Sequence, residues 1–272
     1  MSPVEYKSSE IEKYFKSNRI KWEQFYPSER HIIETLNLSS SSKVLDLGCG
    51  CAGLGCALKE KFGVIDYTGI DINKQAVETA KVLLPDANLH HCDFLNIDVE
   101  DIKFNGFDNV FSLSCIDWND GFHKTFPRAF SYVNEGGWLI LSLRLTMEKS
   151  IFDSKSSFQY INYEGKCEGE TATYVVLNAN EIFTYFKKMN LSEIKGFGYW
   201  GKVGNHTITP YSQICFCVFA VKKKFLGESR DEAEINLDLP QNILDYLETH
   251  LIPICGSFLL LQETAMRHLQ LQ

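Results

Sequence analysis

The sequence has no apolar run of about 18 to 20 residues, which is the length that a membrane-spanning helix needs. It also lacks the apolar core of a signal peptide near its start, so we expect a cytoplasmic protein. Basic residues are few, with 27 Lys and Arg against 35 Asp and Glu. Because Lys and Arg supply most non-specific affinity for phosphates, the net charge of −8 argues against nucleic acid as a partner. We therefore expect neither nucleic acid nor a membrane as a partner.

The sequence also lacks the cysteine spacing that is usual for a zinc site. Its 9 cysteines are odd in number, scattered along the chain and often inside apolar patterns, which favours free thiols over a disulfide framework. His90, His91 and Cys92 are adjacent, but neighbouring residues of a strand point to opposite faces and rarely share one ion. We predict no metal site.

Apolar runs and helical patterns alternate through the first half of the chain, which indicates a parallel sheet with helices on both faces. The expected strands are residues 43–47, 67–72, 87–91, 109–114 and 137–145, and the expected helices between them follow residues 53, 73 and 123. After Arg144 the pattern changes to loop and short extended pieces, then a helix over about 180–189 and two strands. A turn separates these two strands, so we expect the last strand, residues 212–223, to run antiparallel.

Three parts of the chain differ in character. Residues 1–38 read as an N-terminal helical cap, with a capping box of Ser9 and Glu12 and a second helix near Ser28. Residues 39–224 hold the main domain, in which 145–177 read as an insertion on the substrate side. Residues 225–272 begin acidic and then turn helical after Pro240, so we expect a C-terminal helical extension that could form a homo-oligomer.

The stretch "VLDLGCGCAGLG", residues 44–55, carries the strongest functional signal. Gly48, Gly50 and Gly53 match the G-x-G-x-x-G pattern of dinucleotide-binding folds. Asp46, however, lies two positions before the first glycine, where its charge would repel a diphosphate at the helix N-terminus. The same carboxylate would attract the positive ammonium and sulfonium groups of S-adenosylmethionine, so this ligand is favoured over a dinucleotide.

With Asp46 before Gly48 and Gly50, this stretch resembles the first motif of class I S-adenosylmethionine-dependent methyltransferases. Four later stretches are similar to further motifs of that family in the same order: "GIDIN", "HHCDFLN", "FDNVFSLSCIDW" and "VNEGGWLILS". The resemblance covers about residues 28–222. It implies a doubly wound α/β fold of Rossmann-like type, with a mostly parallel seven-stranded sheet, the last strand antiparallel, and helices on both faces.

The resemblance also implies a cofactor site for S-adenosylmethionine, with S-adenosylhomocysteine as product. Asp46 would lie near the methionine end, Asp71 would accept the ribose hydroxyls and Asp93 the adenine amino group. The remaining candidates are the loop residues Gly48, Cys49 and Gly50, the ring neighbours Ile72 and Phe94, Ser114 on the methyl side, and the lid residues Tyr14, Trp22 and Tyr26. Purely structural roles stay open: a plain strand-to-helix turn for the glycines, a helix cap for Asp71 and a loop cap for Asp93.

The methyl acceptor is less defined. The place after the fourth strand reads "SLSCIDWND" and lacks the N-P-P-Y-like motif of many amino-methyltransferases, so we predict a small-molecule acceptor with oxygen or nitrogen undecided. The family has no universal catalytic residue, and the candidates for an aromatic acceptor pocket are Asp117, Trp118, His123, Tyr199, Trp200 and His206. Two other functions stay open: an NAD(P)-dependent oxidoreductase, and a catalytically silent module that binds cofactor and docks a partner.

Overall fold

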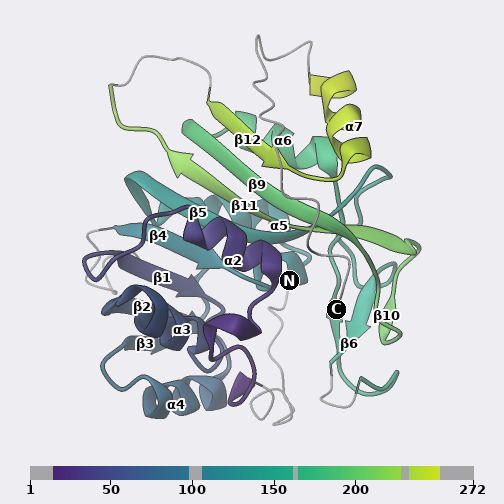
Figure 1. Ribbon diagram of the computed structural model, residues 1–272. Helices are drawn as coiled ribbons and strands as arrows, with labels where there is room; N and C mark the ends of the chain where they lie inside the picture. Colours follow the sequence, from purple (N-terminus) through teal and green to yellow (C-terminus); the bar gives the residue numbers. More distant parts are fainter. Residues whose placement is uncertain (1–14, 98–105, 162–164, 228–232, 252–272) are drawn as a thin grey trace.

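A computed structural model describes residues 15–97, 106–161, 165–227 and 233–251 of the chain (Figure 1). Its centre is a nine-stranded sheet in the order β12-β9-β11-β5-β4-β1-β2-β3, with β8 paired to β5. The strands are β1 (Lys43–Leu47), β2 (Asp66–Asp71), β3 (Asn88–His91), β4 (Phe107–Ser112), β5 (Val133–Thr146), β8 (Leu177–Asn178), β9 (Leu191–Lys202), β11 (Gln213–Lys223) and β12 (Glu234–Asp238). A separate small sheet has the order β10-β6-β7, formed by β6 (Phe158–Tyr160), β7 (Thr171–Thr173) and β10 (Thr207–Ile208).

Helices cover both faces of the large sheet, as the alternating pattern predicts. They are α2 (Pro27–Glu34), α3 (Gly53–Phe62), α4 (Lys74–Leu83), α5 (Phe122–Ser131), α6 (Ala179–Lys187) and α7 (Gln241–Leu251), with the short 3₁₀ turns η1 (Trp22–Gln24) and η3 (Ile116–Trp118). One core contains α2, α3 and α4 residues with Val44 and Phe111, whereas the other contains α5, α6 and α7 residues with Leu45 and Val110. Adjacent strand residues thus enter opposite cores, as the two-residue period of a strand requires.

The strand directions confirm one prediction and correct another. β11 pairs antiparallel with both β5 and β9, as expected for residues 212–223. The prediction of a seven-stranded sheet is wrong, because β8 and β12 also join it. These two strands are only 2 and 5 residues long and pair through their backbones, so no long apolar pattern marks them in the sequence.

The C-terminal part is not purely helical, which corrects the expected helical tail. Residues 234–238 form β12, which pairs parallel with β9 along one edge of the sheet. Only Leu237 is buried among these five residues, so the acidic side chains beside it can stay in water and conceal the strand. The helix expected after Pro240 is confirmed as α7, which packs against α6 through Ile243, Leu244 and Leu247.

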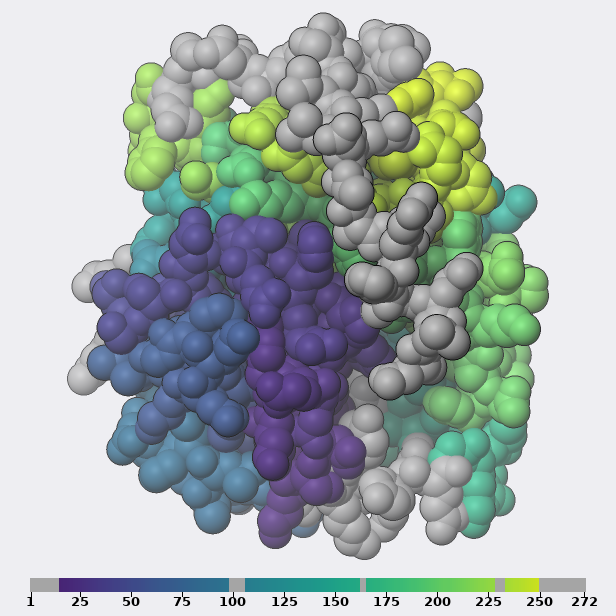
Figure 2. All heavy atoms as spheres, viewed as in Figure 1, coloured from purple at the N-terminus to yellow at the C-terminus, as the bar shows by residue number. Residues whose placement is uncertain are grey.

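The first predicted helix, from Ser9, begins in residues 1–14, which lie outside the described residues. The second predicted helix is confirmed as α2. Figure 2 shows the N-terminal segment from residue 15 in purple, running over the front of the domain beside α3 and α4 in blue. Among the helices of the described part of the chain, none is both long and apolar enough to span a bilayer.

If β12 and α7 belong to the core, truncating an inward-facing leucine of α7 will destabilise the whole domain. We expect Leu247→Ala to lower the free energy of unfolding by about 2 to 5 kcal/mol, since Leu247 is 1% exposed and its removal leaves a cavity. Leu226→Ala is the matched control, because Leu226 is 84% exposed and should change stability by less than about 0.5 kcal/mol. Urea denaturation measures both, and equal effects would contradict the packing described here.

Candidate functional site

A cavity of about 290 Å³ opens where the parallel strands end. The chain segments that follow β1, β2, β3 and β4 each supply part of its wall, since the carboxyl ends of parallel strands meet at one edge of the sheet. Ten of the residues expected to bind cofactor line it: Asp46, Gly48, Cys49, Gly50, Asp71, Ile72, Asp93, Phe94, Ser114 and Tyr26. We call this space the strand-end cavity.

The glycine loop between β1 and α3 depends on glycine for two reasons. Gly48 and Gly50 have φ angles of +74° and +53°, in the left-handed region that glycine adopts at little cost. At Gly53 the reason is space, because an added Cβ would lie 2.1 Å from the Arg19 carbonyl oxygen. The absence of a side chain at Gly53 thus lets the Arg19 backbone of the N-terminal segment pack closely against the start of α3.

Asp71, the last residue of β2, holds the glycine loop in place. Its Oδ2 accepts a hydrogen bond from the Gly50 amide at 2.8 Å, and its Oδ1 accepts one from the Asn73 amide at 2.7 Å. The N-cap of α4 is Asn73, whose side chain accepts from the Ala76 amide, so Asp71 is not the helix cap. Burial raises the pKa of Asp71, although these amide hydrogen bonds oppose the shift.

Asp46 lies deeper, at 4% exposed, near the end of β1. The Tyr67 hydroxyl donates a hydrogen bond to its Oδ2 at 2.6 Å. Burial raises the pKa of Asp46 to about 7, while the Tyr67 hydrogen bond and the charge of Arg19 act in the opposite direction. Burial also raises the pKa of Tyr67, which keeps that hydroxyl protonated as the donor.

Asp93 has a structural role in the loop after β3. Its carboxylate accepts hydrogen bonds from the Leu95 amide at 3.0 Å and from the Asn96 side-chain amide at 2.9 Å. This is the loop-cap role left open by the sequence, and Asp93 also lines the cavity. Phe94 lies beside it in the cavity wall, and its carbonyl accepts from the Tyr132 hydroxyl at 2.7 Å.

The cysteines around the glycine loop fill space next to glycines. A Cβ added at Gly48 would lie 2.6 Å from Cys115 Sγ, and one added at Gly69 would lie 2.9 Å from Cys49 Sγ. Burial raises the pKa of both thiols well above the usual range, so both stay protonated. Protonated thiols behave as small apolar residues, which suits the packing of Cys49 and Cys115 against these glycines.

The N-terminal segment forms one wall of the strand-end cavity through Phe15, Asn18, Arg19, Phe25 and Tyr26. The Arg19 guanidinium lies 4.7 Å from the centre of the Phe25 ring and forms an ion pair with Glu29 at 2.9 Å. Trp22 is not part of this wall, which corrects the expectation for it. Its indole is 4% exposed and packs edge-on against Phe62 at 5.2 Å, because the η1 turn directs it toward α3. Tyr14 lies outside the described residues.

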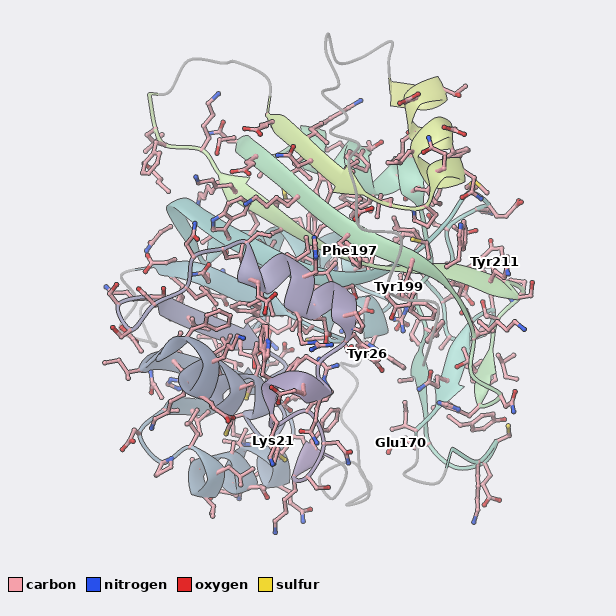
Figure 3. All side chains as sticks on the ribbon, viewed as in Figure 1. Lys21, Tyr26, Glu170, Phe197, Tyr199 and Tyr211 are labelled. Carbon is pink, nitrogen blue, oxygen red and sulfur yellow. The ribbon has the colours of Figure 1, made fainter. Side chains whose placement is uncertain are left out.

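A second cavity of about 420 Å³ adjoins the first, and Tyr26, Ser114 and Trp118 line both. We call it the adjoining cavity. Four predicted acceptor-pocket residues line it: Asp117, Trp118, Tyr199 and His206. Tyr26, directly before α2, and Tyr199, on β9, both line this cavity and lie near one another in Figure 3.

Two other acceptor candidates lie elsewhere. Trp200 follows Tyr199 on β9, so its side chain points to the opposite face. There its indole nitrogen donates to Asn242 Oδ1 at 2.9 Å. His123 is exposed on α5 and lines neither cavity. The expectation that these two residues belong to the acceptor pocket is therefore corrected.

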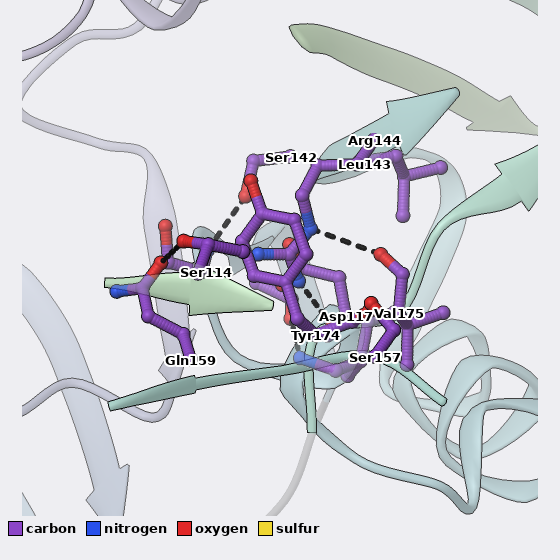
Figure 4. A network of polar contacts seen from close by, with 12 residues as sticks. Ser114, Asp117, Ser142, Leu143, Arg144, Ser157, Gln159, Tyr174 and Val175 are labelled. Carbon is purple, nitrogen blue, oxygen red and sulfur yellow. Dashed lines mark hydrogen bonds and ion pairs between the residues drawn. The ribbon is translucent and has the colours of Figure 1, made fainter. Parts of the chain in front are cut away.

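A buried ion pair of Asp117 and Arg144 lines the adjoining cavity, and Figure 4 shows its polar contacts. Arg144 Nη2 lies 3.0 Å from Asp117 Oδ2 and also donates to the Asp117 carbonyl, while Nε donates to the Val175 carbonyl at 2.9 Å. The guanidinium lies 3.7 Å from the centre of the Tyr174 ring and 4.5 Å from that of Trp118. Burial raises the pKa of Asp117, and the neighbouring Arg144 charge opposes that shift.

Ser114 joins the two cavities in a strained backbone conformation, with φ at +57°. Its amide donates to the Ser142 hydroxyl oxygen at 2.6 Å, which ties the loop after β4 to β5 (Figure 4). This contact places the Ser114 backbone at the boundary between the two cavities.

The sequence reasoning missed several residues of these walls. Arg144 had a signal, because a charged residue inside the apolar strand "GWLILSLRL" must find a partner when it is buried. Arg19 and Glu29 lie in the charged and aromatic stretch "NRIKWEQFYPSER", which indicates a lid but does not single them out, and Gln159 had no signal.

Comparison with known sequences matches the region around this site. Residues 44–137 fit the model of a methyltransferase domain family. A demethylmenaquinone methyltransferase of Staphylococcus epidermidis is 34% identical over 98 residues, which are 35% of this chain and 39% of that protein. A trans-aconitate 2-methyltransferase of Enterobacter is 24% identical over 113 residues, 41% of this chain and 43% of that protein. The chain thus spans about two fifths of the length of these curated relatives.

Solved structures show the same fold. Phosphoethanolamine N-methyltransferase 2 of Haemonchus contortus, in complex with S-adenosyl-L-methionine, has a TM-score of 0.55 at 16% identity, over 79% of this chain and 56% of that one. The N-terminal domain of EvdMO1, with S-adenosylhomocysteine bound, has a TM-score of 0.51 at 14% identity, over 73% and 82%. The fold is therefore the class I, Rossmann-like methyltransferase fold.

The buried ion pair yields a stability prediction. We expect Arg144→Met to lower the free energy of unfolding by about 3 to 5 kcal/mol, because it leaves the Asp117 carboxylate buried without its cation. The double variant Arg144→Met with Asp117→Leu should recover at least about 2 kcal/mol of that loss, since no buried charge remains. Urea denaturation of the wild type and both variants measures this, and a double variant no more stable than Arg144→Met would contradict it.

Asp46 yields a pH prediction. Its folded pKa of about 7 lies above the unfolded value near 3.9, so the folded state binds more protons between these values. This group therefore stabilises the fold below about pH 4 relative to pH 7, and its contribution is lost as pH rises through that window. The Asp46→Asn variant lacks the titration and keeps an acceptor for Tyr67. Its stability relative to the wild type should therefore rise by up to about 4 kcal/mol between pH 4 and pH 7.

Urea denaturation of both proteins at several pH values tests this relation. Parallel stability curves would show that Asp46 titrates in the folded protein as it does in the unfolded chain. Other groups that titrate in this range cancel in the comparison, since both proteins contain them.

Proposed function

We propose that this protein is an S-adenosylmethionine-dependent methyltransferase that acts on a small molecule. The observation that carries the proposal is the pair of carboxylates, Asp46 and Asp71, at the two strand ends that hold the glycine loop. A second, aromatic-lined cavity adjoins the strand-end cavity through Tyr26, Ser114 and Trp118, as transfer between two bound molecules requires. S-adenosylmethionine, when bound, supplies a methyl group on a sulfonium sulfur. The sulfur leaves as the neutral thioether of S-adenosylhomocysteine, which is an excellent leaving group.

The residues of the strand-end cavity fit this cofactor. Asp71 lies at the end of β2, where acidic residues of related α/β folds accept ribose hydroxyls. Asp46, Gly48, Cys49 and Gly50 would hold the methionine end, and Asp93 with Ile72 and Phe94 would surround the adenine. A bound ammonium group would stabilise the ionised form of Asp46, because a nearby positive charge favours the ionised form of a buried carboxyl.

We further propose that Arg19 pairs with the carboxylate of the cofactor. It is the one cationic side chain among the described residues that line the strand-end cavity. The N-terminal segment would then act as a lid, because Arg19, Phe25 and Tyr26 line the strand-end cavity and Tyr26 also lines the adjoining one. Residues 1–38 would serve as this cap, while 145–177 would form the substrate side, since Gln159 and Tyr174 line the adjoining cavity.

The adjoining cavity would hold the methyl acceptor. Methyl transfer is an in-line displacement, so the main task of the protein is to align the acceptor atom with the methyl group and exclude water. The strained Ser114 backbone and the ring of Trp118 lie where the two cavities meet, which suits this positioning role.

The alternative of an NAD(P)-dependent oxidoreductase has less support. A dinucleotide needs a glycine loop that is open to a diphosphate, whereas here the Asp46 carboxylate lies beside the loop and Gly53 accommodates the Arg19 backbone. We also propose a cytoplasmic location, from the lack of an apolar signal-peptide core, and a homo-oligomer formed through residues 225–272. A catalytically silent module remains an outcome of the tests.

Calorimetric titration with S-adenosylmethionine, S-adenosylhomocysteine and NAD tests the proposal. We expect micromolar binding of both adenosyl ligands and a loss of about tenfold to a hundredfold in Asp71→Asn, since a hydrogen bond to a charged acceptor is removed. Asp86→Asn is the matched control, because the Asp86 side chain is 81% exposed and lies outside both cavities. Binding of NAD without either adenosyl ligand would replace this proposal with the oxidoreductase.

A further inference from the structure

In the adjoining cavity, the carboxylates have partners of opposite charge, whereas Lys202 forms no ion pair with a described residue. Both of its carboxylates already have cationic partners: Glu29 accepts from Arg19 and from the Tyr26 amide, each at 2.9 Å, and Asp117 pairs with Arg144 at 3.0 Å. Glu29 is 1% exposed and Asp117 is 3% exposed, and a turn of Asp117 toward a new partner would leave the buried Arg144 without its carboxylate. A cationic acceptor would therefore find no available carboxylate in this wall.

Three further polar side chains of the same wall could meet an acidic group: Arg144, Lys202 and His206. Lys202 is exposed and forms no ion pair with a described residue, and His206 lies in the same wall. Arg144 lines the same wall and donates from Nε and Nη2 to backbone carbonyls, which holds its guanidinium in place there. A guanidinium offers five N–H donors in one plane, a geometry that suits a carboxylate.

Aromatic rings form much of the remaining wall. Tyr199 lies 6.3 Å from Phe216, and Trp118 lies edge-on to Tyr174 at 5.5 Å, centre to centre. Tyr26 completes the group between the two cavities. These rings pack against each other, and the ring surface that they turn to the cavity suits a planar, apolar body.

We propose that the methyl acceptor is a small organic anion with a planar apolar body, and that Arg144, Lys202 and His206 recognise its acidic group. This inference rests on the proposed function, because it assigns the acceptor of the same site. The aromatic walls hold the body of the molecule near the boundary with the strand-end cavity. Because Glu29 and Asp117 are already paired, the charge of Lys202 would set the preference of the cavity for an anion.

Three probes of nearly equal size test the charge preference: phenylacetate, phenylacetamide and phenethylamine, which are an anion, a neutral amide and a cation. Each is titrated into the full-length protein saturated with S-adenosylhomocysteine, and binding is followed by ligand-observed NMR. We expect phenylacetate to bind at least about tenfold more tightly than the other two, since a hydrogen bond to a charged group exceeds a neutral one. Lys202→Glu should reduce that preference about tenfold, and Lys124→Glu, an exposed change on α5 outside both cavities, should leave it intact.

The outcomes separate the two proposals. Failure of S-adenosylhomocysteine to bind overturns the proposed function and this inference with it. If S-adenosylhomocysteine binds normally, three results would each overturn this inference alone. They are no binding of phenylacetate, binding of phenylacetate no tighter than that of phenylacetamide or phenethylamine, and an unchanged preference in Lys202→Glu. Lys202 is exposed, so its substitution tests recognition without breaking the buried Asp117–Arg144 pair.

Discussion

The carboxylate of Asp71 is the contact on which the site depends. It accepts one hydrogen bond from the glycine loop after β1 and another from the start of α4, so a single side chain sets the distance between two neighbouring strand ends. A buried carboxylate costs free energy unless its oxygens are satisfied, and here backbone amides supply the partners. The loop therefore has one favoured position, and the strand-end cavity takes its shape from it.

The N-terminal segment adds the second constraint. Arg19 contacts the glycine loop through its carbonyl at Gly53 and, through its guanidinium, reaches Glu29 in the wall of the adjoining cavity. The Arg19–Glu29 ion pair thus joins the walls of the two proposed ligand sites. Because Tyr26 lies between Arg19 and Glu29 in the chain and lines both cavities, a movement of this segment would change the two sites together.

Much of the site was predictable because its residues follow directly from strand ends. Asp46, Asp71 and Asp93 come after apolar runs whose order along the chain already places them at one edge of a parallel sheet. The aromatic candidates were less predictable. Trp200 and Tyr199 are adjacent, but the register of β9 with β11 decides which of them faces the cavity. Trp22 looked like a lid residue, yet the η1 turn places it in the core beside Phe62.

By itself, the sequence determined the alternation of strands and helices, the glycine loop and the acidic strand ends, because local periodicity and turn chemistry reside in neighbouring residues. Only the tertiary structure decided that β12 joins the sheet, that Arg144 pairs with Asp117, and that Arg19 closes over Gly53. These contacts join residues far apart in the chain. Their formation depends on backbone pairing and on the burial of charge, and neither leaves a periodic pattern that can be read from the sequence.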